Sequence, residues 1–209
     1  MIHTKPTALA PGLFLLPRFA PVALLRAGIE PITAQAPLRQ MVVPGGKAMS
    51  VAITNCGHWG WTSDTRGYRY ASTDPLTAQV WPTMPAEWQA LATSAAALAG
   101  YEGFVPDACL INSYRAGARM GLHQDRDEQD LQWPIVSVSL GASAQFLWGG
   151  PRRRDRVLRL PLHDGDVLVW GGVVRLYFHG VAPVVGLAGP DVGEVPATAR
   201  FNLTFRKAM

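Results

Sequence analysis

The sequence predicts a mainly β protein with flanking helices, built as one domain with an elaboration. Its 209 residues suit one sizeable core better than two ordinary domains. The 21 glycines and 17 prolines are spread along the chain without a collagen period, which favours a turn-rich β protein. From Ala108 onward, short strand-like segments follow one another at the spacing of a barrel or jelly roll. A hydrophobic fraction of 48% with only 16% charged residues excludes a disordered chain.

The first half of the chain predicts a helix, a hairpin and a loop, in that order. Residues Pro21–Ala36 carry apolar side chains among alanines, which indicates a helix interrupted at Pro31. Two strands joined by a Pro-Gly-Gly turn are predicted at Gln40–Val43 and Ala48–Thr54. An aromatic-rich loop, Gly57–Tyr70, follows them.

The second half opens with a helix that begins after Pro85 and ends at Gly100. One face of this helix gathers its apolar residues: Trp88, Leu91, Ala92, Ala95 and Leu98. Strands are expected beyond it at Ala108–Tyr114, Ile135–Leu140, Ala144–Trp148, Val157–Leu162, Val167–Trp170, Leu176–His179 and Ala199–Arg206. The stretch Gly186–Pro196 is expected to be an exposed connection.

Charge and cysteine content narrow the class of protein. The net charge is +4, and all but three of the 19 basic residues are arginine. Arginine favours bidentate contacts with carboxylates, phosphates and bases, although genome composition produces the same bias. Two cysteines, Cys56 and Cys109, predict buried thiols in a reducing compartment. The apolar segment Leu9–Leu25 is broken by prolines and an arginine, so we expect a cytoplasmic protein without a membrane span or signal peptide.

The candidate chemistry centres on two histidines and one carboxylate. One residue separates His123 from Asp125, and on an extended segment this spacing points both side chains the same way. His179 follows much later in the chain. Two histidines and one carboxylate can occupy one face of an octahedral iron(II), leaving three positions for cosubstrate and dioxygen. Such triples also arise by chance, and the alternative interpretation is a polar turn.

The segment Arg200–Arg206 alternates polar and apolar residues strictly, so a strand here has one apolar and one polar face. Inside a barrel its two arginines would need anionic partners, which a dicarboxylate would supply, whereas on an outer face they would be solvated. The arginines are roughly 20 Å apart along a strand, so one carboxylate is not expected to meet both. Asn112 and Tyr114 offer an amide and a phenol on one face of another strand, or else hydrogen bonds to a turn.

Segments around these residues resemble the AlkB family of iron(II)- and 2-oxoglutarate-dependent dealkylases. The matching segments of the second half are Ala108–Tyr114, Leu122–Glu128, Pro134–Gly141, Val169–Gly172, Phe178–Gly180 and Arg200–Arg206. Those of the first half are Leu38–Met41, Pro44–Gly46, Thr54–His58 and Gly60–Thr62. The resemblance implies a double-stranded β-helix, or jelly roll, at about residues 105–206, preceded by a nucleotide-recognition lid at about residues 38–84.

The same resemblance implies which residues hold metal, cosubstrate and substrate. The catalytic iron(II) ligands would be His123, Asp125 and His179. The residues that would bind 2-oxoglutarate are Asn112, Tyr114, Arg200, Asn202 and Arg206, with Arg200 at the distal carboxylate and Arg206 nearer iron. The residues that would contact the base or its backbone are Trp61, Tyr68, Asp127 and Arg153. Without the resemblance, Trp61, Tyr68 and Asp127 would be interpreted as a core indole, a strand aromatic and a turn cap. For Arg153 the alternative is a solvated arginine run, but a basic contact is favoured there even without the resemblance.

The implied reaction is oxidative demethylation of 1-methyladenine and 3-methylcytosine in DNA, with RNA as a second candidate substrate. It uses 2-oxoglutarate and O2 and releases formaldehyde, succinate and CO2, which directly reverses alkylation damage. Two alternatives remain open: a catalytically inactive nucleic-acid-binding module on the same fold, and an oxygenase acting on proteins or small molecules. A single compact domain is expected to be a monomer.

Three features depart from the family pattern. Val43 stands where threonine is more usual, and Ser113 stands where a basic residue is usual. The connection Gly186–Pro196 is a few residues longer. These departures bear on contacts with the nucleic-acid backbone and on lesion preference, and they leave the three iron ligands intact.

Overall fold

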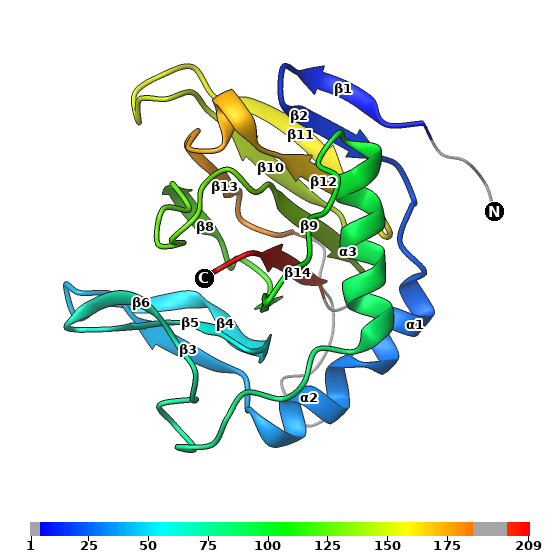
Figure 1. Cartoon of the computed structure of the whole chain (residues 1–209). Coiled ribbons are helices and arrows are strands. Elements are labelled where there is room, and N and C mark those ends of the chain that lie inside the picture. Colours follow the sequence, from blue (N-terminus) through cyan, green and yellow to red (C-terminus); the bar gives the residue numbers. More distant parts are fainter. Residues whose placement is uncertain (1–4, 186–199) are drawn as a thin grey trace.

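The computed structural model describes residues 5–185 and 200–209. Its strands form an eight-stranded sheet (β1-β2-β12-β9-β14-β7-β4-β3), a four-stranded sheet (β11-β10-β13-β8) and a two-stranded sheet (β5-β6). The helices run down one side of the molecule, and the β5–β6 hairpin extends from the other side (Figure 1).

The elements follow one another in this order: β1 (Thr7–Ala10), β2 (Leu13–Leu16), α1 (Val22–Ala27), α2 (Ile29–Gln35), β3 (Arg39–Val42), β4 (Ala48–Gly57), β5 (Gly60–Asp64), β6 (Gly67–Ala71), α3 (Ala86–Leu98), β7 (Ala108–Tyr114), β8 (Met120–His123), β9 (Ile135–Leu140), β10 (Ala144–Trp148), β11 (Leu158–Leu162), β12 (Val167–Trp170), the 3₁₀ turn η1 (Gly172–Val174), β13 (His179–Val181) and β14 (Arg200–Arg206).

The two larger sheets stack on each other through a shared core. Phe146 and Trp148 of β10 belong to the same buried cluster as Leu168 and Trp170 of β12. The ring centroids of Phe146 and Trp170 lie 5.8 Å apart, which is direct contact between the sheets. All pairings within each sheet are antiparallel. The predicted mainly β jelly roll is therefore confirmed.

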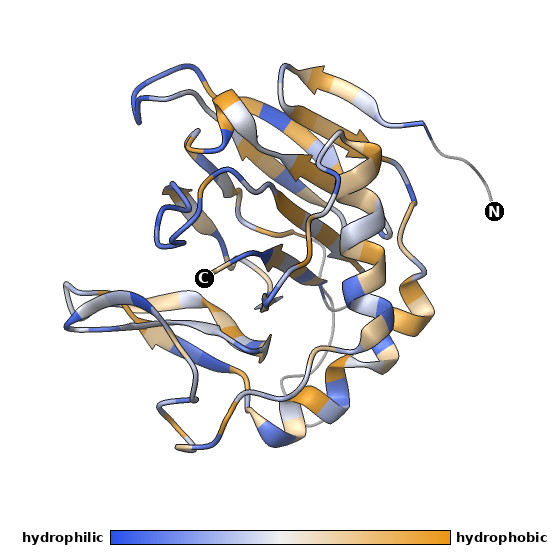
Figure 2. Cartoon of the chain, in the orientation of Figure 1, coloured by the Kyte–Doolittle hydropathy of each residue, from blue (hydrophilic) through white to orange (hydrophobic). Residues whose placement is uncertain are grey.

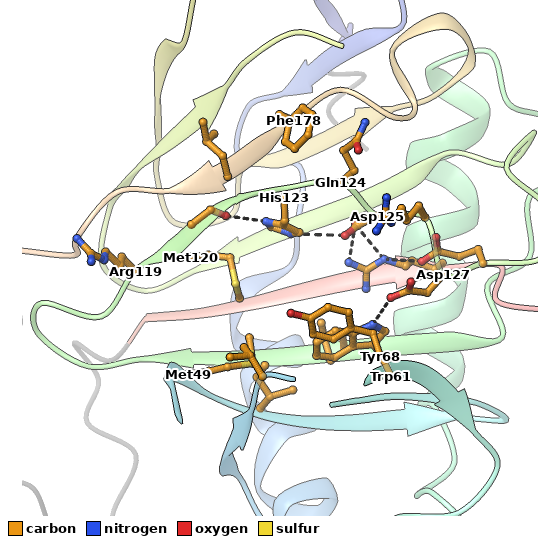
Figure 3. Close-up of a pocket in the computed structure, with 18 of the residues that line it drawn as sticks. Met49, Trp61, Tyr68, Arg119, Met120, His123, Gln124, Asp125, Asp127 and Phe178 are labelled. Atoms are coloured by element: carbon orange, nitrogen blue, oxygen red, sulfur yellow. Dashed lines mark hydrogen bonds and ion pairs between the residues drawn. The ribbon is translucent and has the colours of Figure 1, made fainter. Parts of the chain in front are cut away.

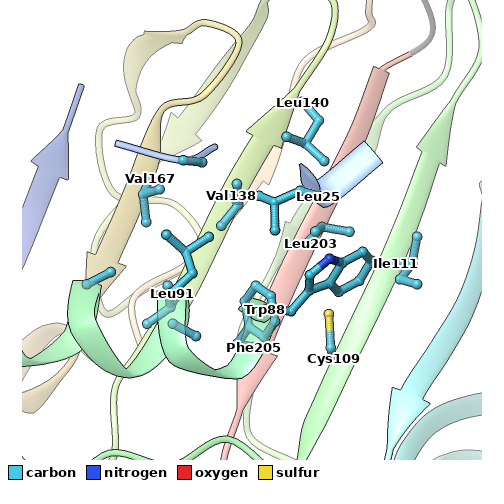
Figure 4. Packing of buried hydrophobic residues seen from close by; sticks show 14 of the residues in the cluster. Leu25, Trp88, Leu91, Cys109, Ile111, Val138, Leu140, Val167, Leu203 and Phe205 are labelled. Atoms are coloured by element: carbon cyan, nitrogen blue, oxygen red, sulfur yellow. The ribbon is translucent and has the colours of Figure 1, made fainter. Parts of the chain in front are cut away.

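Strand β14 occupies the centre of the larger sheet, between β7 and β9, and all seven of its residues are buried. Its apolar residues Phe201, Leu203 and Phe205 join the core cluster under α3, where Phe205 meets Trp88 edge to face at 6.4 Å (Figure 4). Because side chains alternate across a strand, its polar residues must face the smaller sheet. The predicted division of this strand into an apolar and a polar face is confirmed.

Helix α3 begins after Pro85, as predicted, and Gly100 follows it with φ of 89°. Trp88, Ala92 and Ala95 are fully buried against the sheet. Deleting a side chain as large as Trp88 from such a core typically costs about 3–5 kcal/mol. The prediction for Leu98 was wrong, because this side chain is 47% exposed at the end of the helix.

The N-terminal segment differs from its prediction in two ways. The chain forms two short helices that meet at Gly28, not at Pro31. Pro31 lies in the first turn of α2, where backbone N–H groups have no partner within the helix, so a proline is tolerated there. A Cβ at Gly28 would lie 2.9 Å from the indole of Trp88, so the break brings the chain close to α3. Strands β1 and β2 were not predicted, and β2 extends the large sheet by pairing with β12.

The predicted loop Gly57–Tyr70 is instead a hairpin, in which β5 and β6 pair from Gly60↔Ala71 to Asp64↔Gly67. The amide of Asn55 fixes the start of this hairpin. Its Nδ2 donates to the Trp61 carbonyl oxygen, and its Oδ1 accepts from the Trp61 N–H, both at 3.0 Å. Regular structure thus continues through a segment whose composition suggested a loop.

One smaller prediction also needs correction, one strand was not predicted, and two predicted features lie outside the described residues. The strand expected at Leu176–His179 begins only at His179, because the preceding residues leave the turn η1. Residues Met120–His123 form β8, which pairs with this strand. The connection Gly186–Pro196 and the expected strand residue Ala199 lie outside the described residues. Within the described ranges, α3 is the longest helix at 13 residues, too short to cross a bilayer.

Cys56 and Cys109 are free and fully buried, as predicted. They lie directly opposite each other in the register of β4 and β7. Both therefore act as small apolar groups in the core beneath α3.

Gly60 gives a test of how tightly the hairpin is packed. A Cβ at this position would overlap the indole of the buried Trp81, whose Nε1 donates to the Ala71 carbonyl oxygen at 2.8 Å. We expect Gly60→Ala to lower the free energy of unfolding by about 1–3 kcal/mol. Gly45→Ala is the control, since nothing lies within 4 Å of its added Cβ. Urea unfolding measures both, and equal midpoints for the two variants would contradict this packing.

Candidate active site

Three potential metal ligands meet where β8 and β13 pair. His123 ends β8, His179 begins β13, and the two are direct partners in the register. Asp125 lies just beyond β8, and the ligand atoms of the three residues all lie within 4.8 Å of one another. Nε2 of His123 is 3.5 Å from Oδ1 of Asp125, and Nε2 of His179 is 3.7 Å from its Oδ2. Figure 3 shows His123 and Asp125 facing each other at the edge of a cavity.

Each imidazole is oriented through its other nitrogen. Nδ1 of His123 lies 2.8 Å from the carbonyl oxygen of Gly121, and Nδ1 of His179 lies 3.0 Å from that of Tyr177. A protonated Nδ1 donates to these carbonyls and leaves the Nε2 lone pair directed toward Asp125. Two imidazoles and one carboxylate in this arrangement fit one face of an iron(II) ion.

Arg206 keeps Asp125 ionised. Its Nη2 and Nε donate to Oδ2 of Asp125 at 2.6 and 3.1 Å. Burial would raise the pKa of Asp125, but the charge of Arg206 beside it holds that pKa well below its usual range. Burial lowers the pKa of His179, and the neighbouring His123 lowers it further. An ionised carboxylate and a neutral imidazole are the forms that bind a metal.

The polar face of β14 meets polar side chains of β7 behind these ligands. The register places Arg200 opposite Tyr114 and Asn202 opposite Asn112. The guanidinium carbon of Arg200 lies 5.7 Å from the Tyr114 ring centroid, and its Nη2 donates to Ser139 Oγ at 3.2 Å. The fold therefore brings all five predicted cosubstrate residues onto one strand pair: Asn112, Tyr114, Arg200, Asn202 and Arg206.

This surface fits a dicarboxylate. Among the described residues, Nε of Arg200 and Oδ1 of Asn112 are buried and lack a hydrogen-bond partner. An unpaired N–H on a guanidinium that is only 1% exposed is costly, and a ligand carboxylate would satisfy it. Burial, opposed by the charge of Arg200, raises the pKa of Tyr114 to about 12, so its hydroxyl stays a neutral donor. The assignment of Arg200 and Arg206 to opposite ends of 2-oxoglutarate stays a prediction.

A cavity of about 600 Å³ opens beside the triad, within the size range of small-molecule pockets. His123, Asp125 and Arg206 line it together with all four predicted substrate residues: Trp61, Tyr68, Asp127 and Arg153. Trp61 stacks on Tyr68 with ring centroids 5.5 Å apart, and its indole N–H donates to Oδ2 of Asp127 at 2.8 Å (Figure 3). The structure thus joins a metal-ligand set to an aromatic platform.

The arginines of the β10–β11 connection differ in their surroundings. Arg153 lines the cavity, with its guanidinium carbon 5.8 Å from the Phe178 ring centroid. Arg152 instead pairs with Asp155, at 2.9 Å between Nε and Oδ1. Figure 2 shows this connection as one of the most hydrophilic parts of the chain. Arg153 therefore faces the cavity, whereas Arg152 is held by Asp155.

Sequence reasoning missed three residues of the site: Tyr70, Glu128 and Arg175. Glu128 accepts hydrogen bonds from the Tyr70 hydroxyl and from Nη2 of Arg175, at 2.7 and 3.0 Å. Arg175 stands inside an otherwise apolar segment, and a lone charge in such a place signals a buried partner. Glu128 continues the acidic run that contains Asp125, which could have marked it as a third carboxylate at the site.

Replacing Asp125 by alanine should abolish metal binding, because it removes the carboxylate from the three-ligand set. We expect iron(II) affinity, measured anaerobically by calorimetry, to fall by more than the ~10–100-fold that losing a supporting residue typically costs. Asp127→Ala is the matched control, since Asp127 lines the same cavity but contacts Trp61 rather than the ligand set. Near-normal metal affinity in Asp125→Ala would refute the ligand assignment.

Comparison with known proteins agrees with this geometry. Residues 12–206 match the model of the 2OG-Fe(II) oxygenase superfamily. The chain is 52% identical to the alpha-ketoglutarate-dependent dioxygenases AlkB of Salmonella typhimurium and of Escherichia coli, each over 96% of this chain and 92% of the relative. The solved structure of OsALKBH1 superposes with a TM-score of 0.80 at 27% identity, covering 97% of this chain and 99% of that one. The chain therefore belongs to the AlkB family of iron(II)- and 2-oxoglutarate-dependent dioxygenases.

Proposed function

We propose that this dioxygenase removes methyl groups from 1-methyladenine and 3-methylcytosine in DNA, with RNA as a second substrate. The observation that carries the proposal is the cavity shared by His123, Asp125, Trp61, Tyr68 and Asp127. When bound, iron(II) with 2-oxoglutarate and dioxygen hydroxylates the methyl group, which leaves as formaldehyde while 2-oxoglutarate becomes succinate and CO2. The residues of the chain position the reactants around that chemistry.

In this proposal Arg200 binds the distal carboxylate of 2-oxoglutarate, and Arg206 meets the end nearer iron. The unpaired Nε of Arg200 supports the first assignment, since a carboxylate would complete its hydrogen bonding. The contact of Arg206 with the metal ligand Asp125 supports the second. Tyr114, Asn112 and Asn202 complete a polar wall along the cosubstrate.

The methylated base enters between the triad and Trp61. Methylation at these ring nitrogens blocks base pairing, so the lesion costs less to extrude from a duplex than an intact base does. The methylated ring is also cationic near neutral pH, and the carboxylate of Asp127 favours it electrostatically over a neutral base. Asp127 holds the Trp61 indole in the structure, and Tyr68 is 47% exposed over that indole.

The alternative of an inactive nucleic-acid-binding module is disfavoured by the complete ligand set His123, Asp125 and His179. The decisive assay measures formaldehyde and succinate release with methylated and unmethylated oligonucleotides, using Asp125→Ala as the inactive control. We expect formaldehyde only with the methylated strand and the wild-type protein. Binding without turnover would support the inactive module, and succinate release that ignores methylation would point to a protein or small-molecule substrate. The monomeric state and cytoplasmic location stay predictions.

Trp61→Ala should separate base recognition from cosubstrate binding. Loss of the indole removes the stacking platform, and we expect about 1–3 kcal/mol weaker base binding. The readout is demethylation of a 3-methylcytosine oligonucleotide below saturation, paired with 2-oxoglutarate affinity from the absorbance of the anaerobic iron complex. If cosubstrate binding collapses instead, Trp61 is a structural residue. If demethylation is unaffected, another aromatic such as Tyr68 or Trp59 holds the base.

We expect Arg153 to contribute one phosphate contact, because it lines the cavity whereas Arg152 does not and pairs with Asp155 instead. We expect Arg153→Gln to weaken oligonucleotide binding and to reduce the slope of log affinity against log salt by about 0.7–0.9. Arg152→Gln is the matched control, and its slope should change less because Asp155 already pairs with this side chain. Equal slopes for wild type and Arg153→Gln would mean that Arg153 meets no phosphate.

A further inference from the structure

A buried cluster of charged side chains lies against Asp125, and two of its members, Glu128 and Arg175, have no role in the function proposed above. Glu128, Arg175 and Arg206 expose only 2%, 4% and 8% of their side-chain surface. Asp125, at 9%, completes the cluster, so two carboxylates face two guanidiniums. Charges persist at this depth only when each is paired, and the position of each one therefore depends on the others.

Arg206 is shared between the two carboxylates of this cluster. Its Nε lies 3.1 Å from Oδ2 of Asp125 and 3.2 Å from Oε1 of Glu128. Its Nη2 donates to Asp125 at 2.6 Å. A change in the charge or position of Glu128 therefore alters how Arg206 meets the metal ligand and, in the proposed function, the cosubstrate.

Arg175, at the end of the turn η1, holds Glu128 in place. Its Nη2 donates to Oε2 of Glu128 at 3.0 Å. Its Nη1 and Nε donate to the carbonyl oxygens of Asp125 and Trp133, at 2.6 and 3.0 Å. The Arg175 guanidinium thus contacts the segment from Asp125 to Trp133 at three points. Because it binds Oε2 of Glu128, the other carboxylate oxygen, Oε1, is left for other partners.

The β5–β6 hairpin supplies the remaining contact of Glu128. The Tyr70 hydroxyl donates at 2.7 Å to Oε1, the same oxygen that faces Arg206. The hairpin is a sheet of its own, separate from the four-stranded sheet that carries His123 and His179. Tyr70 is also the register partner of Trp61, so the residue that meets Glu128 lies beside the proposed stacking platform.

We propose that Glu128 is a positioning residue for Arg206, and that Tyr70 makes this positioning depend on the hairpin. While Tyr70 donates to Oε1, the charge of Glu128 is partly satisfied and Arg206 stays directed at Asp125. When the hairpin moves away, Oε1 draws Arg206 toward itself. The contact of the hairpin with Glu128 and the binding of 2-oxoglutarate therefore favour each other, because coupling between two equilibria is reciprocal. The inference rests on the part of the proposed function that assigns Arg206 to 2-oxoglutarate.

Tyr70→Phe tests this link by removing one hydroxyl. We expect 2-oxoglutarate affinity, measured with Mn(II) by calorimetry, to fall about 10-fold. Hydrogen exchange of the Gly60–Ala71 amides is the second readout. Mn(II) with 2-oxoglutarate should slow exchange in the wild-type hairpin and leave exchange in the Tyr70→Phe hairpin nearly unchanged. Tyr101→Phe is the matched control, since Tyr101 packs on the core beside α3 and should behave as wild type.

A double-mutant cycle separates positioning from simple structural support. In a Glu128→Gln background the charge that draws Arg206 is gone, so adding Tyr70→Phe should cost no further cosubstrate affinity. Additive losses in the cycle, or equal ligand-induced protection in Tyr70→Phe and wild type, would overturn the proposal. Should the glutamine variant fail to fold, the exchange experiment on Tyr70→Phe decides alone. Neither readout uses nucleic acid, so this test is independent of the proposed substrate. If 2-oxoglutarate slows hydrogen exchange in the wild-type hairpin but the protein releases no formaldehyde from methylated oligonucleotides, only the proposed substrate is refuted.

Discussion

Strand β14 has to satisfy two environments at once, and the rest of the molecule is arranged around that requirement. One face of the strand must be apolar because α3 covers it, and the other carries buried polar groups, among them Arg206, which holds Asp125. Its position between β7 and β9 leaves no exposed edge along the segment. The strict alternation of its residues is therefore a condition of both folding and chemistry.

The depth of this polar face explains its composition. Arg200 and Arg206 cannot remain buried without anionic or polar partners, and the structure supplies Ser139, Asp125 and Glu128 for this purpose. The donor left over on this face, Nε of Arg200, is the clearest sign in the described residues that a ligand belongs there. Because every buried charge has to be matched by a partner, these polar side chains also contribute to the stability of the core.

The sequence predicted those features that depend on local pattern. The face of α3 follows from spacing, the two faces of β14 follow from alternation, and the proximity of His123 to Asp125 follows from one intervening residue. The β5–β6 hairpin escaped prediction because Gly60–Asp64 mixes small and polar residues and carries no clear period of two. What holds that segment as a strand is distant: the Asn55 side chain and the buried Trp81.

The roles of Glu128 and Arg175 could not be read from the chain for a related reason. Their partners lie 42 to 78 residues away in sequence, and a charged residue gives no sign of which distant group it will meet. The candidate site was predictable where a motif is contiguous or where the family resemblance supplied the assignment. It was not predictable where three separate segments converge, as they do at Oε1 of Glu128.

The central place of β14 also constrains how the chain folds. Its two neighbours, β7 and β9, come far earlier in the sequence, and they pair with each other only through β14. Until that strand arrives, the larger sheet consists of two halves, each with an open edge beside the future active site. Closing such long-range pairings is slow, and open edges invite association with other chains. A chain in which β14 is not yet in place therefore exposes two sheet edges that favour association with other chains.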